Sequence, residues 1–193
     1  MRFPLRAVAV SGVFIVGIVL AGALWPQAVA RTRSGDESLE YRVKAAYLLN
    51  FTRYVEWPTG PTGSDSVLSI CVLGADPFGR ILDATVAGRT AHGRSLRVRR
   101  FQSATEAAGC EVVFVSSKTW RRSPESLKSL QRAGSLSVGE SEQFARVGGV
   151  IGFVILDQTV RFVVNDEARS RAGLRISSRM LALAAAIYGR GGL

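Results

Sequence analysis

Histidine and cysteine are scarce in this chain, which limits the catalytic and metal sites that it can build. The 193 residues include one histidine, His92, and two cysteines, Cys71 and Cys110. Any Ser-His-Asp or Cys-His arrangement would have to use His92, which lies in the turn-like segment 88–94. One histidine and two cysteines cannot supply the four ligands of a zinc site. We therefore expect a binding protein with no catalytic residue, metal or cofactor, and a hydrolase that uses His92 is the alternative.

The glycine patterns of nucleotide-binding and hydrolytic proteins are also missing. No Gly-x-Ser-x-Gly nucleophile elbow and no closely spaced dinucleotide-binding glycines occur. Gly74 and Gly79 do bracket a predicted helix start, where an anion could bind. However, no Walker lysine follows, and Asp76 would place negative charge where a phosphate should sit. The segment therefore predicts a structural turn between a strand and a helix.

The first thirty residues have the three parts of a secretory signal. A basic start with Arg2 and Arg6 leads into an apolar run over 7–24 and the small residues of 28–30. No cysteine follows the apolar run, so a lipoprotein anchor would have no attachment site. We predict a signal peptide over 1–30, cleavage after Ala30 and localisation in the periplasm. A retained membrane anchor is the alternative, because the run approaches the ~18 residues that span a bilayer.

Acidic residues are few relative to basic ones. The chain has 15 Asp and Glu against 25 Lys and Arg, and loss of Arg2 and Arg6 with the leader reduces the net charge from +10 to +8. Such an excess would indicate nucleic-acid binding in a cytoplasmic protein, but we expect none in an exported one. A basic surface outside the inner membrane suits anionic lipid headgroups or an acidic partner domain, and a solvated face without a partner is the alternative.

The patterning after the leader predicts a disordered lead over 31–40 and one α/β domain over 41–190. The run 67–73 is almost entirely apolar and rich in β-branched residues, which is typical of a strand covered on both faces. Strands that alternate with helices predict a three-layer α/β sandwich with a mostly parallel central sheet. The two-residue turn at Asp157 and Gln158 predicts a C-terminal antiparallel hairpin. The expected helices are 41–57, 78–85, 103–109, 123–133, 143–147 and 166–187, and the expected strands are 67–73, 95–101, 111–115, 136–138, 148–156 and 159–164.

Two predicted helical segments, 41–57 and 175–188, carry more apolar residues than one side of a sheet needs. In 41–57 the apolar residues recur at helical spacing, with Arg42, Lys44, Asn50 and Arg53 largely on the other side. Packing of these aromatics in the core is one explanation, and a docking surface shared with a homodimer contact is the other. The residues predicted to bind a partner are Tyr41, Arg42, Tyr47, Phe51, Arg53, Arg175 and Arg179.

The two cysteines lie on or next to predicted strands. Cys71 is inside the strand 67–73, and Cys110 directly precedes the strand 111–115. An oxidising compartment favours a disulfide between them. Two buried thiols are the alternative.

Six separated blocks of the sequence resemble the YfiR family, also called DUF4154, in the right order and over nearly the whole mature chain. Family members often carry a cysteine pair where Cys71 and Cys110 stand, and no second pair is present here. The blocks are YRVKAAYLLNFTRYVEWP (41–58), LSICVLGADPFG (68–79), GRSLRVRRF (93–101), CEVVFVSS (110–117), GGVIGFVILDQTVRFVVN (148–165) and ARSRAGLRISSRMLALA (168–184).

The resemblance implies a periplasmic regulator that is not an enzyme. Such a protein represses a membrane-anchored diguanylate cyclase by binding its periplasmic sensor domain, which limits cyclic-di-GMP signalling and biofilm formation. The alternative is a periplasmic receptor for a small ligand that serves another membrane sensor or transporter. Its cleft would lie at the carboxyl ends of the strands, near 74–78 and 116–119, as is general in open α/β sheets.

Overall fold

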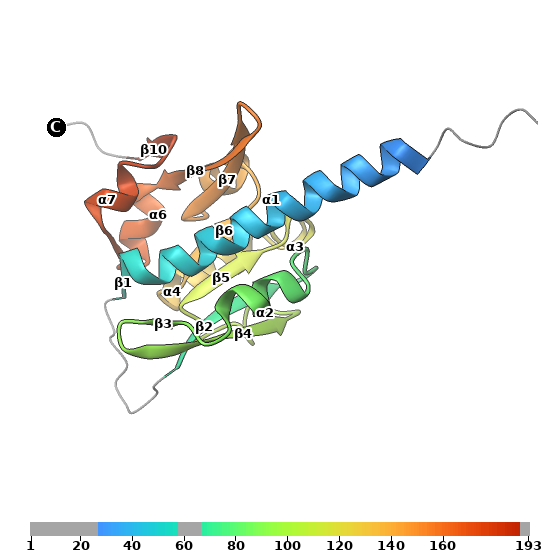
Figure 1. Ribbon diagram of the computed structural model, residues 1–193. Coiled ribbons are helices and arrows are strands. Elements are labelled where there is room, and N and C mark those ends of the chain that lie inside the picture. Colours follow the sequence, from blue (N-terminus) through green and yellow to red (C-terminus); the bar gives the residue numbers. More distant parts are fainter. Residues whose placement is uncertain (1–26, 58–66, 190–193) are drawn as a thin grey trace, which may run out of the picture.

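An eight-stranded sheet lies at the centre of the computed structural model, which describes residues 27–57 and 67–189 (Figure 1). The strand order is β10-β8-β7-β6-β5-β2-β4-β3. Strands β4, β2, β5, β6 and β7 run parallel, β3 and β8 pair antiparallel with the two outer members, and β10 runs parallel to β8. The mostly parallel α/β sheet predicted from the sequence is therefore confirmed. The strands are β2 (Val67–Leu73), β3 (Thr90–Ala91), β4 (Arg94–Phe101), β5 (Val112–Val115), β6 (Leu136–Gly139), β7 (Ile151–Leu156), β8 (Thr159–Asn165) and β10 (Ala186–Tyr188).

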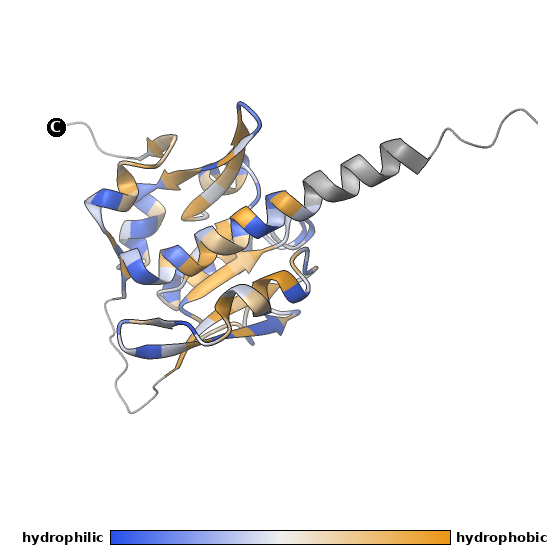
Figure 2. Ribbon diagram, viewed as in Figure 1, coloured by the Kyte–Doolittle hydropathy of each residue, from blue (hydrophilic) through white to orange (hydrophobic). Residues whose placement is uncertain are grey.

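Helices cover both faces of the sheet and complete the three layers. On one face lie α1 (Gln27–Tyr54) and α2 (Arg80–Val86), which pack on each other and on the sheet. On the opposite face α3 (Ser117–Arg122), α4 (Glu125–Arg132) and α5 (Glu142–Arg146) contribute Trp120, Leu127 and Phe144 to a second core. Strands buried between two cores must be apolar along their whole length, which is why the central strands are uniformly hydrophobic (Figure 2).

The hairpin of β7 and β8 closes through the turn that the sequence predicts. Asp157 and Gln158 both have positive φ, 48° and 57°, and Leu156 pairs with Thr159 across the turn. Positive φ at both central residues defines a type I′ turn, whose twist matches that of the strands it joins. The antiparallel hairpin is confirmed. A second hairpin of this kind joins β3 to β4 through His92 and Gly93, with φ of 50° and 74°.

The single C-terminal helix predicted over 166–187 is wrong. The structure has α6 (Asp166–Arg171), β9 (Arg175–Ile176), α7 (Ser178–Leu181) and β10 in its place. Gly173 has φ of 68° and donates to Ser170, while Leu174 donates to the carbonyl of Arg169. These two hydrogen bonds form a Schellman motif, which ends α6. The released chain then pairs β9 antiparallel with β1 (Val55–Glu56).

Three smaller expectations also differ from the structure. Residues 104–109 form turns instead of a helix, although Ser103 and Glu106 do bond each other as a capping box. Helix α3 lies ahead of α4, in a segment for which the sequence pattern predicts no helix. Helix α1 continues through 31–40, where a disordered lead is predicted, because extending an existing helix adds one hydrogen bond per residue without a new nucleus.

Part of the sequence lies outside the described residues. The predicted signal peptide falls there except for its last four residues, which begin α1. Residues 58–66, which connect the expected helix 41–57 to the expected strand 67–73, fall there as well. Within the described ranges, no helix combines the length and the apolar character that a membrane span requires.

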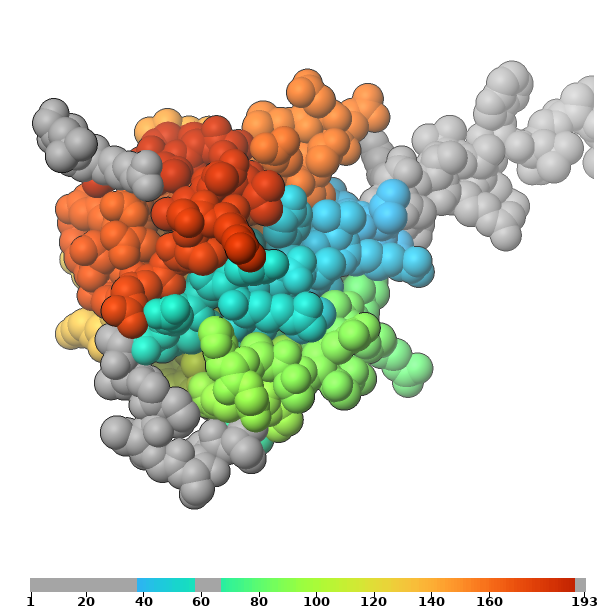
Figure 3. All heavy atoms as spheres, turned by 60° about the vertical axis from the view of Figure 1, so that its left-hand side comes forward, coloured from blue at the N-terminus to red at the C-terminus, as the bar shows by residue number. Residues whose placement is uncertain are grey.

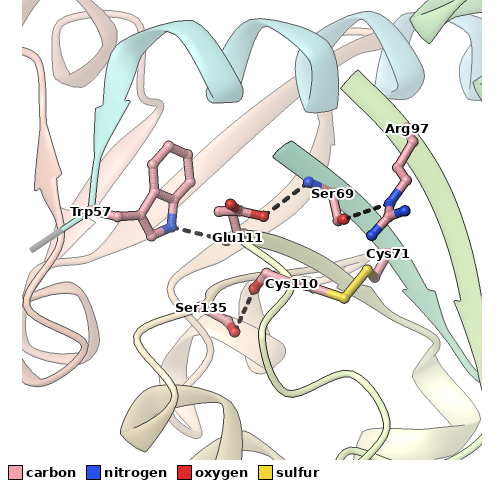
Figure 4. Close-up of a disulfide and its surroundings, with 7 residues drawn as sticks. All are labelled: Trp57, Ser69, Cys71, Arg97, Cys110, Glu111 and Ser135. Atoms are coloured by element: carbon pink, nitrogen blue, oxygen red, sulfur yellow. Dashed lines mark hydrogen bonds between the residues drawn. A yellow bond between two sulfur atoms is a disulfide. The ribbon is translucent and has the colours of Figure 1, made fainter. Parts of the chain in front are cut away.

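The predicted disulfide between Cys71 and Cys110 is confirmed. It joins β2 to the residue two before β5, with the Cα atoms 6.1 Å apart and both side chains buried in the second core (Figure 4). Neighbouring groups hold both ends in place. Ser135 Oγ donates to the carbonyl of Cys110 at 2.7 Å, and the Ser69 N–H donates to the Glu111 carboxylate at 2.9 Å. The bridge therefore ties the carboxyl half of β2 to the segment that leads into the adjacent strand β5.

Loss of this disulfide should destabilise the domain strongly. The bridge spans 39 residues, and closing a loop of that size in the unfolded chain contributes roughly 3 to 4 kcal/mol. The double variant Cys71→Ala, Cys110→Ala should lose about that much free energy of unfolding in urea titrations. Dithiothreitol should lower the stability of the wild-type protein similarly and leave the double variant unchanged. A double variant as stable as the oxidised protein would contradict this account.

Candidate functional site

Exposed apolar side chains gather where α1 passes the outer end of the β7–β8 hairpin. Leu39 and Val43 of α1 are 60% and 37% exposed, and Ile155 and Leu156 at the end of β7 are 52% and 47% exposed. Figure 3 shows the hairpin, in orange, beside the blue part of α1. We call these four residues the apolar seam. They are four of the seven large apolar side chains that are exposed in the described structure.

The seam lies between two hollows. One hollow of about 490 Å³ lies on the α1 side of the hairpin and includes Leu39, Val43 and Ile155 in its wall. The other, of about 460 Å³, includes Leu156 and reaches β10 and the loop after β6. Glu40 and Ile155 line both hollows, so the two share a border. A partner could therefore contact the hairpin on both of its faces.

A buried charge cluster holds α1 in place beside the seam. Lys44 is 4% exposed and donates to Glu140 at 2.7 Å. Tyr41 donates to the same carboxylate at 3.0 Å, and Glu40 forms a second ion pair with Lys44. Glu140 directly follows β6, so these bonds connect α1 to the carboxyl end of a central strand. The expectation that Lys44 lies on the exposed polar side of its helix is wrong. Lys44 is buried because the Glu140 carboxylate accepts a hydrogen bond from its ammonium group.

Two glycines set the path of the chain around Glu140. A Cβ at Gly139 would lie 2.4 Å from the Phe144 ring, and one at Gly149 would lie 2.1 Å from it. Any side chain at either position would collide with Phe144, a fully buried residue of α5. The close approach lets Ser141 cap α5 by accepting the Phe144 N–H. The loop that carries Glu140 is therefore fixed by packing on both sides.

The structure separates the residues predicted to bind a partner into surface and core. Phe51 is 1% exposed and packs on Phe153 and Phe162, so its assignment to a docking surface is wrong. Tyr47 is half-buried in the same aromatic cluster and donates to the carbonyl of Val160 at 3.3 Å. Tyr41 is half-buried and belongs to the charge cluster. These aromatics fill the core because they lie on the face of α1 that meets the hairpin.

The four predicted arginines are exposed but lie in two places. Arg42 adjoins the seam, whereas Arg53 follows it by eleven residues, which is roughly 16 Å along a helix. Arg175 bonds Glu56 in the β1–β9 pair, directly after the end of α1. Arg179 lies on α7, whose N-cap Ser177 donates its N–H to the Tyr54 carbonyl. Arg53, Arg175 and Arg179 thus share one end of α1, and Arg42 lies at the other.

The hydrophobic pattern of the sequence does not predict the seam. Ile155 and Leu156 end a strand whose inner half is buried, and Leu39 precedes the helix that we predicted. The signal that could have found them is the type I′ turn, because it places β7 residues at the tip of a hairpin that extends past the helix layer.

Ionisable groups near the seam are tuned by local bonds. Burial, together with a hydrogen bond to Glu142, raises the pKa of Tyr188. The same bond, with one from Arg146, lowers the pKa of the Glu142 carboxyl. On the opposite end of the sheet, hydrogen bonds from the Arg100 guanidinium lower the pKa of Asp83 and tie α2 to β4. Asp83 and Glu142 are therefore ionised at neutral pH and form ion pairs with Arg100 and Arg146, whereas Tyr188 is neutral.

The cleft expected for a small ligand corresponds to a hollow of about 380 Å³ at the carboxyl ends of β2 and β5. Gly74 lies against Ser116 and Thr119 there, and Lys118 and Arg122 reach its rim. Asp76 turns away from it, because its carboxylate accepts the N–H groups of Phe78 and Gly79 at 2.8 and 3.2 Å. The structural role predicted for this turn thus agrees with its hydrogen bonds.

The only histidine lies on an exposed turn. His92 occupies the tight turn between β3 and β4. Among the described residues, no three His, Cys, Asp or Glu side chains are grouped as a metal site would need. We therefore take the apolar seam and its two hollows as the candidate binding surface of this protein.

An open, mostly parallel sheet between two helical layers, with a buried disulfide and an apolar surface seam, defines an α/β domain suited to binding. The sequence profile of the YfiR/HmsC-like family matches residues 41–185, well over half of the chain. This protein belongs to the YfiR/HmsC-like family. The family is regulatory and not catalytic.

Solved structures with a similar fold are distant in sequence. A Streptococcus pneumoniae structure described as an ABC domain in complex with L-Trp matches with a TM-score of 0.50 and 14% identity, over 74% of this chain and 60% of that chain. A Vibrio cholerae conserved domain protein matches with a TM-score of 0.47 and 14% identity, over 62% of this chain and 54% of that chain. This chain thus matches less than two thirds of the length of either structure. The first likeness supports the α/β fold alone.

Lys44 should be essential for stability although it is a charged residue. Lys44→Met would leave the Glu140 carboxylate without its ammonium partner, and breaking a buried ion pair costs about 3 kcal/mol. Urea unfolding should show that loss, and Lys44→Met combined with Glu140→Gln should recover part of it. Arg42→Met, on the exposed side of the same helix, should change stability little. Equal losses from Lys44→Met and Arg42→Met would contradict the assigned cluster.

Proposed function

We propose that this protein represses a membrane-anchored diguanylate cyclase by binding the periplasmic sensor domain of that enzyme. Repression would limit cyclic-di-GMP signalling and biofilm formation. The family supports the general role. The secretory pattern of residues 1–30 supports export to the periplasm with a mature N-terminus at Arg31. Under this proposal the protein acts by occupying a surface, and it needs no catalytic residue.

The apolar seam is the surface that supports docking best. Protein interfaces have an apolar centre and a polar rim, and contiguous exposed apolar side chains mark such centres. Leu39, Val43, Ile155 and Leu156 would form the centre, and their exposure is the observation that carries the proposal. Arg42 lies on the rim, where its charge would steer an acidic partner domain without contributing much affinity.

The opposite end of α1 suits a contact between two copies of the chain. Tyr54 is 43% exposed there, near Arg53 and the β1–β9 pair. The predicted homodimer would use this end and leave the seam free for the sensor domain. Arg53, Arg175 and Arg179 would then belong to the dimer contact.

The test is made in cells that lack the gene. Deletion should raise cellular cyclic-di-GMP, and the wild-type gene should lower it again. The double variant Ile155→Glu, Leu156→Glu should fail to lower it, because two carboxylates at the centre of an interface cannot be buried without a partner. Both side chains are exposed, so the variant should keep its stability and abundance.

Leu183→Glu serves as the control, because Leu183 is 62% exposed and lines neither hollow. It should repress like the wild type. The gene is also overproduced in wild-type cells. Cellular cyclic-di-GMP that stays unchanged after both deletion and overproduction would contradict the cyclase assignment. Normal repression by the hairpin variant would contradict the docking surface, and an intact mass that still begins at Met1 would contradict cleavage of the leader.

A receptor for a small anionic ligand is the second candidate, supported by the hollow beside Gly74. Hydroxyl groups of Ser116 and Thr119 line it, and Lys118 and Arg122 add positive charge without a carboxylate in its wall. Ligand-dependent thermal stabilisation that Lys118→Ala removes and the hairpin variant keeps would favour this candidate over the cyclase repressor.

A further inference from the structure

The face of the sheet that carries α3 and α4 is strongly basic. Seven cationic side chains on β4, α3 and α4 are exposed or half-exposed. None of them forms an ion pair with a carboxylate among the described residues; their contacts are to rings and hydroxyls, such as Arg121 over Trp120. We call these seven residues the basic face: Arg97, Arg99, Lys118, Arg121, Arg122, Lys128 and Arg132.

Strand register puts the β4 arginines on the same side as the two helices. Arg97 lies opposite Ser69 and Arg99 opposite Cys71 in the parallel β2–β4 pair. Side chains of directly paired residues project to the same face of a sheet. Cys71 packs in the second core with Trp120 of α3 and Leu127 of α4. The basic face is therefore one surface, although its residues come from three elements.

Acidic residues do not neutralise this face. Within β4, the turn 103–109, α3 and α4, the carboxylates are Glu106 and Glu125. Glu106 is held by Ser103, and Glu125 forms no ion pair in the described structure. By contrast, the α1–α2 face pairs its buried or half-buried carboxylates with cations, as Glu140 with Lys44 and Asp76 with Arg100. The basic face thus gathers seven cations against two carboxylates, whereas these carboxylates of the other face are paired with cations.

The basic face lacks the apolar anchors of a protein interface. None of the seven exposed large apolar side chains of the described structure belongs to β4, α3 or α4, and one of them, Val147 after α5, lines a hollow together with Lys128 and Arg132. Protein interfaces depend on a few buried aromatic or aliphatic anchors. A surface with many separate cations and no such anchors instead suits a plane of phosphate groups, to which each Lys or Arg contributes independently.

Two hollows on this face could admit lipid headgroups. The larger, about 690 Å³, lies between α4 and α6, and its charged lining is Lys128, Arg132 and Arg171 together with Glu125. The smaller, about 380 Å³, has Lys118 and Arg122 at its rim. The cationic side chains lie at the rims of these hollows. They would contact phosphates while still in water, so binding would not carry the desolvation cost of a buried ion pair.

We propose that the basic face docks on the surface of an anionic phospholipid bilayer. This inference goes beyond the cyclase repressor and does not depend on it. Docking would be peripheral and electrostatic, because no apolar group inserts. It would leave the apolar seam, on the opposite layer, accessible to a protein held at the same membrane.

The test compares two charge reversals that change the net charge equally. The first variant carries Arg122→Glu, Lys128→Glu and Arg132→Glu on the basic face. The second carries Arg42→Glu, Arg53→Glu and Arg80→Glu, all exposed on the α1–α2 face. Each is co-sedimented with vesicles of phosphatidylcholine that contain phosphatidylglycerol, and with vesicles of phosphatidylcholine alone. The protein is the product recovered from the envelope, and its intact mass is recorded because a retained leader would insert into either vesicle.

Wild-type protein should bind the vesicles with phosphatidylglycerol, fail to bind phosphatidylcholine alone, and dissociate as salt screens the charges. The basic-face variant should bind at least about tenfold more weakly, since three favourable phosphate contacts become repulsive. The α1–α2 variant should keep most of the affinity.

Four results would overturn the proposal. Wild-type protein that does not bind the anionic vesicles would show a solvated face. Equal losses in the two variants would show an effect of net charge alone. Release of bound protein by inorganic phosphate, at an ionic strength where chloride does not release it, would show a small-anion site. Unchanged vesicle binding by a basic-face variant that no longer captures an acidic sensor domain in lipid-free solution would show a protein interface.

Discussion

The packing of α1 on the base of the β7–β8 hairpin is the contact on which the rest of the structure depends. Tyr47 and Phe51 of the helix meet Phe153 and Phe162 of the hairpin, with ring centroids 5.4 to 6.0 Å apart. Lys44 adds the buried ion pair to Glu140 one turn earlier. These contacts cover one face of the sheet, and they also hold Leu39 and Val43 level with the hairpin tip. The apolar seam exists because the aromatic cluster beneath it packs α1 against the hairpin.

Two surfaces of different chemistry follow from this layered arrangement. The α1 layer buries Lys44 in ion pairs with Glu40 and Glu140 and exposes apolar side chains beside them, which suits a protein partner. The α3–α4 layer exposes cations without anchors, which suits phosphate groups. The disulfide lies in the core under the second layer and links β2 to the segment that leads into β5, so it supports the strands that both surfaces share. Under the two proposals, one face would meet the membrane and the other would meet a membrane-anchored sensor.

The sequence predicts those features that local physics determines. The buried strand at 67–73, the two-residue turn at Asp157 and Gln158, and the pairing of the two cysteines all agree with the structure. The final helix does not, because the left-handed conformation of Gly173 ends α6 where periodicity alone predicts continuation. The burial of Lys44 is also invisible in the sequence, since its partner Glu140 lies 96 residues away. The seam also joins residues that are far apart along the chain, Leu39 and Val43 with Ile155 and Leu156, and only tertiary packing brings them together.

A photoreactive amino acid placed at Ile155 tests the central claim most directly, because it reports contact at the seam in living cells. Irradiation should cross-link the protein to the periplasmic domain of a membrane-anchored diguanylate cyclase, and the same group at Leu183 should not. The cross-linked band should disappear when Leu39→Glu and Val43→Glu are introduced, because these changes place charge in the seam. A cyclase cross-link from Leu183 but none from Ile155 would contradict the account.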